Sequence, residues 1–384
     1  MVGRLIAGLI VVALVATACG REEPAVAAAE AQTPTTQAAA VPSTTLPVVT
    51  STSLSPSPAT ATTTTTRAPR PPIVLGFAGD TSFTHDLHAR DPLGDITAEV
   101  SAADLMFVNL ETTVAEADVG TRVDKTYTFK SPPESVHLLV DAGIDAVQLA
   151  NNHTLDFRRP AILRTLELLD DSAVVNAGAG ADPEAAYAPA YLDVNGWTIG
   201  LVALSRVPCD WSASGENTRP EVAWTCDPFV VEGIAAVQEA ELNADLVIVM
   251  VHWGIELDHC PQAYQRDLAD TWVRVGADLI IGGHPHVLQG VERLGDAWLV
   301  NSTGNFAFPS ARQASARSAL FEFTVAEDGI ALRAIPVRIT SGRPAPATGD
   351  DGASILSDLS RWSFGLDFDD AGNAVPSDEV GACG

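Results

Sequence analysis

Six apolar segments of the sequence end in side chains that can bind a metal ion. Two segments end in carboxylates, Asp80 and Glu111. The other four end in carboxamides or imidazoles: Asn151, Asn152 and His153; His252; His284 and His286; and Asn301 and Asn305. Nitrogen and oxygen donors without thiolates suit Mn, Fe or Zn. The donors are numerous enough for two divalent transition metals with a shared ligand, which is the chemistry of phosphoester hydrolysis.

The motif "GGHPH" illustrates the local pattern. Pro285 fixes its own φ and disfavours helix at His284. In an extended segment, residues two apart point to the same side, so His284 and His286 would face one edge. Gly282 and Gly283 would permit a close backbone approach to a metal centre. Alone, the motif fits a single-metal site, but beside the other strand ends it predicts one donor to each of two metals.

The elements that must position these donors alternate along the chain. Strand-like apolar runs cover residues 73–78, 105–109, 145–150, 198–204, 245–251, 278–282 and 297–301, and helical patterns cover 131–143, 160–172, 229–242 and 264–276. This alternation predicts a largely parallel α/β sheet, in which ligands bind at the carboxyl ends of strands. A hairpin over 318–339, with a turn at Asp328–Gly329, adds an antiparallel part.

Each donor also has a structural alternative. Asp80 and Glu111 could be turn or cap residues, and His252 could be a buried core histidine. Their co-occurrence at six strand ends favours a shared site over a structural α/β domain without one. Other catalytic patterns are absent: there is no Gly-x-Ser-x-Gly elbow, and the Gly-rich segment 178–182 lacks the lysine of a P-loop and is interpreted as a turn.

The charge balance excludes some partners. The chain has a formal net charge of −27, from 22 basic and 49 acidic residues. Nucleic acid is therefore excluded as a partner, since its phosphates need clustered Lys and Arg. Arg158 and Arg159 are two of the few cations and could hold an anionic substrate, although a solvated helix start is the alternative.

The N-terminus predicts the compartment. Residues 1–18 place Arg4 before a short apolar stretch, which is typical of a signal peptide rather than a membrane span. Cys19 resembles a lipobox cysteine, which implies cleavage before it and lipid attachment; an ordinary secreted protein is the alternative. Residues 19–72 combine this cysteine with an Ala/Thr/Pro/Ser-rich, disordered tether. We expect an extracytoplasmic lipoprotein anchored to the outer face of the bacterial cell membrane.

Four cysteines remain beyond Cys19. An even number outside the cell favours disulfides, and three pairings are possible. Cys209 with Cys226 is favoured because it closes a short polar loop, and Cys260 with Cys383 would then tie down the C-terminal tail. The folded domain is predicted over residues 73–341. Residues 342–384 are acidic and Pro/Gly-rich, and are predicted to be loosely ordered.

Six motifs resemble a known family. The segments "FAGDTSF", "VNLETTV", "LANNHTLDF", "VHWGIE", "GGHPHVLQG" and "NSTGNFAF" have the order and spacing of the CapA family, the poly-γ-glutamate capsule biosynthesis proteins. This family is similar to the calcineurin-like metallophosphoesterases. The resemblance covers about residues 73–309 and implies a four-layer α/β/β/α sandwich with a dinuclear metal site at its strand ends.

The resemblance also implies a role for each motif residue. The implied metal ligands, with Glu111 as the bridging acid, are Asp80, Glu111, Asn152, His252, His284 and His286. His153 is similar to the superfamily's catalytic histidine, which assists the leaving group, and Asp156 would orient it. Three positions depart from the wider superfamily or family pattern: Thr81–Ser82 replaces a histidine-containing motif, Glu111 replaces an aspartate, and no glycine follows Phe157.

Two functions fit these expectations. The first is a metal-dependent hydrolase or transferase whose substrate is a phosphoester, or an ester or amide link in a cell-surface polymer. The second is a non-catalytic assembly or binding protein for a capsule polymer, within a capsule-synthesis membrane complex. The charge of −27 would repel a polyanion unless metals or a local basic patch offset it.

Overall fold

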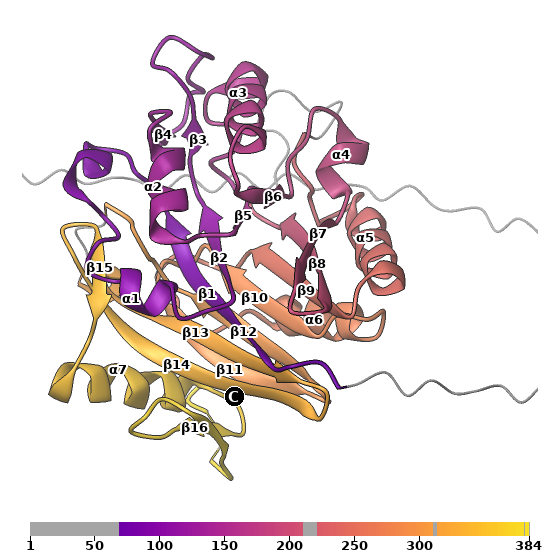
Figure 1. The fold of residues 1–384 in the computed structure, drawn as a ribbon, viewed down its shortest axis with the longest axis vertical. Coiled ribbons are helices and arrows are strands. Elements are labelled where there is room, and N and C mark those ends of the chain that lie inside the picture. The colour runs from indigo at the N-terminus through magenta and orange to yellow at the C-terminus, as the bar shows by residue number, and fades with distance from the viewer. Residues whose placement is uncertain (1–68, 210–220, 310–312, 380, 384) are drawn as a thin grey trace, which may run out of the picture. The chain divides into compact units, whose positions relative to one another are not determined.

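Two mixed β-sheets form the framework of the computed structural model, which describes residues 69–209, 221–309, 313–379 and 381–383 (Figure 1). The seven-stranded sheet has the order β15 (Arg343–Pro346), β14 (Gly329–Thr340), β13 (Arg317–Ala326), β1 (Ile73–Thr81), β2 (Leu105–Leu110), β5 (Ala146–Gln148) and β6 (Val175–Ala177). The six-stranded sheet has the order β11 (Leu288–Leu294), β12 (Ala297–Thr303), β10 (Leu279–Gly283), β9 (Leu246–His252), β8 (Trp197–Ser205) and β7 (Ala190–Val194).

Each sheet contains four adjacent parallel strands. In one sheet β1, β2, β5 and β6 are parallel neighbours, and in the other β12, β10, β9 and β8 are. The predicted hairpin is β13 and β14, whose register pairs Ala326 with Gly329. The turn therefore consists of Glu327 and Asp328, one residue earlier than the sequence predicts.

Helices cover the outer faces of both sheets and complete a four-layer α/β/β/α sandwich, as predicted. Strand β2 shows the layering: Leu105 and Phe107 belong to the core between the sheets. Met106, Val108 and Leu110 instead pack with α2 (Ser135–Ala142) and α3 (Arg158–Asp170). On the other sheet, α5 (Val230–Asn243) and α6 (Ala263–Val273) form the outer layer. Because both faces of these strands are buried, the strand sequences are continuous apolar runs.

An aspartate before each of four parallel strands fixes the strand register. Each carboxylate accepts the backbone N–H of a residue in the neighbouring strand at 2.7 to 2.9 Å, and the four are Asp104, Asp145, Asp245 and Asp278. The backbone N–H of each aspartate donates in return to the carbonyl of that same neighbouring residue. These register clamps stand before β2, β5, β9 and β10, at the amino-terminal edge of the sheets.

The C-terminal region differs from its prediction. Residues from 342 onward were expected to be loosely ordered, but they form β15, helix α7 (Gly349–Trp362), and the pair β16 (Leu366–Phe368) and β17 (Ala374–Pro376). Ile355, Leu356 and Leu359 of α7 pack into the core between the sheets. The acidic Asp350 and Asp351 lie in the first turn of α7, where negative charge stabilises a helix.

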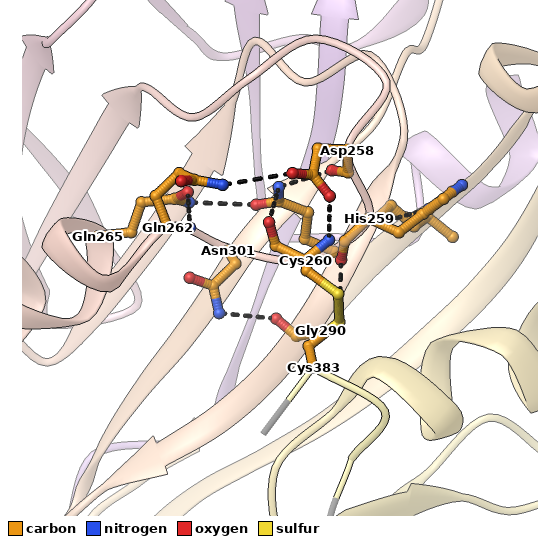
Figure 2. Close-up of a disulfide and its surroundings, with 10 residues drawn as sticks. Asp258, His259, Cys260, Gln262, Gln265, Gly290, Asn301 and Cys383 are labelled. Atoms are coloured by element: carbon orange, nitrogen blue, oxygen red, sulfur yellow. Dashed lines mark hydrogen bonds between the residues drawn. A yellow bond between two sulfur atoms is a disulfide. The ribbon is translucent and has the colours of Figure 1, made fainter.

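Four cysteines form two disulfides, in the expected pairing. One joins Cys209 to Cys226, and the other joins Cys260 to Cys383. Figure 2 shows the second bridge beside Asp258, whose carboxylate accepts hydrogen bonds from Cys260 N and from the Gln262 side chain. This bridge ties the segment after β9 to the end of the chain.

The N-terminal predictions fall mostly outside the described residues. This applies to the signal peptide over 1–18, to the lipidation site Cys19, and to the tether up to residue 68. Within the described ranges, no helix is both long and apolar enough to span a lipid bilayer.

Candidate metal centre

The predicted donors meet where the carboxyl ends of the parallel strands of both sheets come together. The seven-stranded sheet contributes Asp80 on β1, Glu111 directly after β2, and Asn152 after β5. The six-stranded sheet contributes His252 at the end of β9, and His284 and His286 after β10. A bridge between Asp80 and Asn305 joins the two edges, with Asp80 N donating to Gly304 O at 3.0 Å.

Glu111 lies at the middle of this cluster. Its side chain is 0% exposed, and neither carboxylate oxygen has a hydrogen-bond partner of good geometry. Burial alone would raise the pKa of Glu111, but the imidazoles of His286 and His252 outweigh it and hold that pKa well below its usual range. A buried carboxylate without donors is costly. A bound cation would satisfy both oxygens.

Two groups of donors share Glu111. One consists of Glu111, His252 and His284, and the other of Asp80, Glu111 and His286. Within each group the ligand atoms lie within 4.8 Å of one another. The Nδ1 atom of His284 is also buried without a partner. These unsatisfied nitrogen and oxygen atoms could hold a metal ion.

The two histidines of the "HPH" motif have opposite electrostatic surroundings. Burial lowers the pKa of His284 well below its ordinary value, and the nearby rings of His252 and His286 add to this effect. Burial would also lower the pKa of His286, but Glu111 and Asp80 raise it to about 10. Without a metal, these shifts favour the neutral form of His284 and the protonated form of His286, whose Nδ1 lies 3.0 Å from Asp80 Oδ2.

The backbone of this motif differs from the predicted extended segment. His284 has φ of 94° and His286 has φ of 57°, so both occupy the left-handed region, and their ring centroids lie 6.0 Å apart. Both glycines are closely approached, Gly282 by the neighbouring strand and Gly283 by a candidate donor. A Cβ at Gly282 would lie 2.1 Å from Asn301 O, and one at Gly283 would lie 2.7 Å from Asp80 Oδ1. Such strained backbone is frequent at functional sites.

His153 and Asp156 form a pair beside the donors. His153 Nδ1 donates to Asp156 Oδ2 at 2.6 Å, and the ring stacks on Phe129 with centroids 4.0 Å apart. The other ring nitrogen, Nε2, lies 3.7 Å from Glu111 Oε1. At the position where the family has a glycine, Arg158 has φ of 63°. The turn therefore keeps a left-handed residue there, and Asp156 stays in contact with His153.

Three polar residues near the site were missing from the predicted set or given no role in it. Asn109 donates to Asp80 Oδ1 at 2.7 Å and lies 3.1 Å from His252 Nδ1. Asn305 Oδ1 lies 2.8 Å from His286 Nδ1. Lys125 Nζ donates to Asp156 Oδ1 at 3.1 Å and to Asn152 O at 2.8 Å. The first two stand in ligand motifs, but Lys125 lies in a loop that has no sequence signal.

Of the other residues singled out in the sequence, one lies at the site and two make their contacts elsewhere. Asn152 does converge on the site, with Oδ1 2.9 Å from His252 Nε2. Arg159 instead forms an ion pair with Glu221 and donates to Ala181 O. Asn301 donates to Gly290 O, away from the donors. A substrate-binding role for Arg158 and Arg159 stays a prediction.

The sequence of this centre matches a described family. Residues 72–310 match the model of the bacterial capsule synthesis protein PGA_cap. The chain belongs to this family. The match runs from β1 to beyond β12 and contains every candidate donor, which confirms the resemblance inferred from the motifs.

Two curated CapA relatives show the extent of the similarity. The PGA biosynthesis protein CapA of Bacillus subtilis (strain 168) is 32% identical over 251 residues, 65% of either chain. The capsule biosynthesis protein CapA of Bacillus anthracis is 29% identical over 228 residues, 59% of this chain and 56% of that one. The matched region thus spans less than two thirds of these relatives. A solved structure of a novel phosphatase from Mycoplasma pneumoniae is 16% identical, covers 70% of this chain and 94% of its own, and has a TM-score of 0.46.

Proposed function

We propose that this protein is a metal-dependent hydrolase or transferase that acts outside the cytoplasm in the biosynthesis of a capsule or another cell-surface polymer. One observation carries the proposal: Glu111 is fully buried, stands among three imidazoles, and has two oxygens without hydrogen-bond partners. A structural core would not retain an unsatisfied ionised carboxylate at this cost. The names of the two CapA relatives support the link to capsule synthesis.

The chain's own residues would divide the chemistry between them. Asp80, Glu111, Asn152, His252, His284 and His286 would hold two divalent transition metals, Mn, Fe or Zn. Such metals supply an activated nucleophile and neutralise charge on the reacting group. Asp156 keeps a proton on His153 Nδ1, so Nε2 is the atom that would give a proton to the leaving group. Asn109 and Asn305 would orient the ligands that they contact.

The proposed location follows from the cysteines and the N-terminus. Two disulfides in one domain are typical of proteins outside the reducing cytoplasm. Cleavage before Cys19, followed by lipid attachment to its thiol, would anchor the protein to the outer face of the membrane. The proposed partners there are a cell-surface polymer or phosphoester and a capsule-synthesis membrane complex.

Metal analysis combined with an activity screen tests this function. Elemental analysis by mass spectrometry should find about two equivalents of transition metal per purified full chain. The loaded protein should cleave at least one of a panel of phosphomonoesters, phosphodiesters and polymer esters or amides, and chelation should abolish turnover. Equal turnover by a metal-free sample would refute the proposal.

A binding role without catalysis is the second candidate. It is favoured by one observation: the donor group of Asp80, Glu111 and His286 has a single imidazole, since Thr81 and Ser82 offer none. A protein that is fully loaded with metal, binds a capsule polymer and turns over no substrate in the panel would select this candidate.

A further inference from the structure

A cavity of about 260 Å³ lies directly beside the proposed metal centre. Its lining includes Asn152 and Asp156, which belong to the proposed site. Much of the remaining wall is apolar and comes from four separate segments, through Val123, Leu155, Val207, Pro208 and Trp224. A mostly apolar cavity with a few polar groups at one end is the usual form of a small-molecule subsite.

The charges at this cavity do not suit an anion. Among the described lining residues, Lys125 is the one cation, and it already donates to Asp156 Oδ1 and Asn152 O. Two lining carboxylates, Asp124 and Asp156, outnumber it. Neither Arg158 nor Arg159 is among the described lining residues. A carboxylate or phosphate placed in the cavity would therefore meet a net negative surrounding.

A disulfide holds the apolar wall in place. Val207 and Pro208 directly precede Cys209, and Trp224 stands two residues before Cys226, so the Cys209–Cys226 bridge links both parts of the wall. Backbone hydrogen bonds of 2.8 Å, from Ser205 N to Ala223 O and from Thr225 N to Ser205 O, join the same two segments. The wall is thus formed before any ligand binds, which reduces the cost of binding.

We propose that this cavity binds an uncharged apolar group of the substrate, alkyl or aryl, attached next to the bond that reacts at the metal centre. The inference rests on the proposed function and narrows its substrate class. It favours an ester with an apolar substituent over a polycarboxylate chain at this subsite.

Binding of two phosphonates to the metal-loaded full chain tests the inference by calorimetry. Phenylphosphonate and phosphonoacetate offer the centre the same phosphonate, but the first carries an aryl ring and the second a carboxylate. Burial of the ring predicts that phenylphosphonate binds at least about tenfold more tightly. Equal or tighter binding of phosphonoacetate, or no binding of phenylphosphonate, overturns the inference.

Variants locate the preference in this cavity. Leu155→Gln and Val207→Thr keep the approximate side-chain size but add polar atoms, and each should reduce the preference for phenylphosphonate several-fold at unchanged metal content. Leu163→Gln, at an exposed position of α3, is the matched control and should leave the ratio unchanged. An unchanged ratio in both cavity variants also overturns the inference.

The binding assay separates this inference from the proposed function. If the protein prefers phenylphosphonate but cleaves no ester, the apolar subsite is supported and the hydrolase proposal is refuted. If the protein cleaves esters but prefers phosphonoacetate, the hydrolase proposal is supported and the apolar subsite is refuted.

Discussion

His153 lies beside Glu111 in the candidate centre, with His153 Nε2 3.7 Å from Glu111 Oε1. The opposite ring nitrogen of His153 is held by Asp156 at 2.6 Å. The histidine is therefore clamped on one side, and its free nitrogen points toward the carboxylate that the two donor groups share. This geometry separates the residue that would move a proton from those that would bind metal.

Asp156→Asn should lower turnover without loss of metal. The amide would hold His153 in the wrong tautomer, so kcat should fall by about 10²-fold or more. Metal content measured on the same sample should match that of the parent protein. Asp170→Asn, at an exposed position near the end of α3, is the control. A fall in metal content parallel to kcat would instead make Asp156 part of the metal shell.

His286→Ala should remove one bound metal, and Glu111→Gln should weaken the binding of both metals. His286 belongs to one donor group, whereas Glu111 belongs to both. Elemental analysis should give about one equivalent for the first variant and less than one for the second. The exposed His137→Ala on α2 should keep about two. Equal losses in the His286 and Glu111 variants would argue against a shared carboxylate.

The register clamps predict a difference between two substitutions of Asp278. Asp278→Ala leaves the N–H of Val247 without its acceptor and should lower the free energy of unfolding by about 1–3 kcal/mol. Asp278→Asn keeps an acceptor for the N–H of Val247 and should lower the free energy of unfolding by a smaller amount. Urea unfolding of the metal-free protein measures both, with the exposed Asp296→Asn as the control.

The same aspartate predicts a dependence on pH. Burial raises the pKa of Asp278, so its ionised form costs more in the folded chain than in the unfolded one. Its contribution to stability is therefore greatest below the ordinary carboxyl range and decreases as pH rises through the raised pKa. The stability difference between Asp278→Asn and the parent should shift in favour of the variant between pH 3 and pH 7. A difference that is constant over this range would contradict the pKa shift.

The two disulfides should have different effects when they are removed. Replacing Cys260 and Cys383 by Ser opens a link across 123 residues and should lower the free energy of unfolding by about 2–5 kcal/mol at unchanged metal content. Replacing Cys209 and Cys226 opens a link across 17 residues. That pair should weaken phenylphosphonate binding more than the first pair does, because it holds the cavity wall. The reverse order of ligand effects would contradict this assignment.

The sequence predicted that the candidate donors would converge, because parallel strands place their carboxyl ends on one edge. Asp80, Glu111 and His252 could be assigned from the apolar runs before them. The conformation of "HPH" could not be predicted, because the left-handed φ of His284 and His286 depends on contacts with the neighbouring strands. Lys125 could not be found either, since only the folded chain brings its loop to Asp156.

The C-terminal region was mispredicted for a different reason. Its overall composition is acidic and rich in Pro and Gly, but Ile355, Leu356 and Leu359 recur at helical spacing within it. Composition averaged over residues 342–384 concealed this apolar face. The acidic residues that suggested disorder instead begin helix α7.

The register clamps and the metal donors occupy opposite edges of the same strands. Asp145 and Asp278 stand before their strands, and Glu111 and His284 follow theirs. Substitution of the candidate donors at one edge would leave all four register clamps at the other edge in place. Strand alignment and the candidate metal centre can therefore be altered independently of one another by substitution.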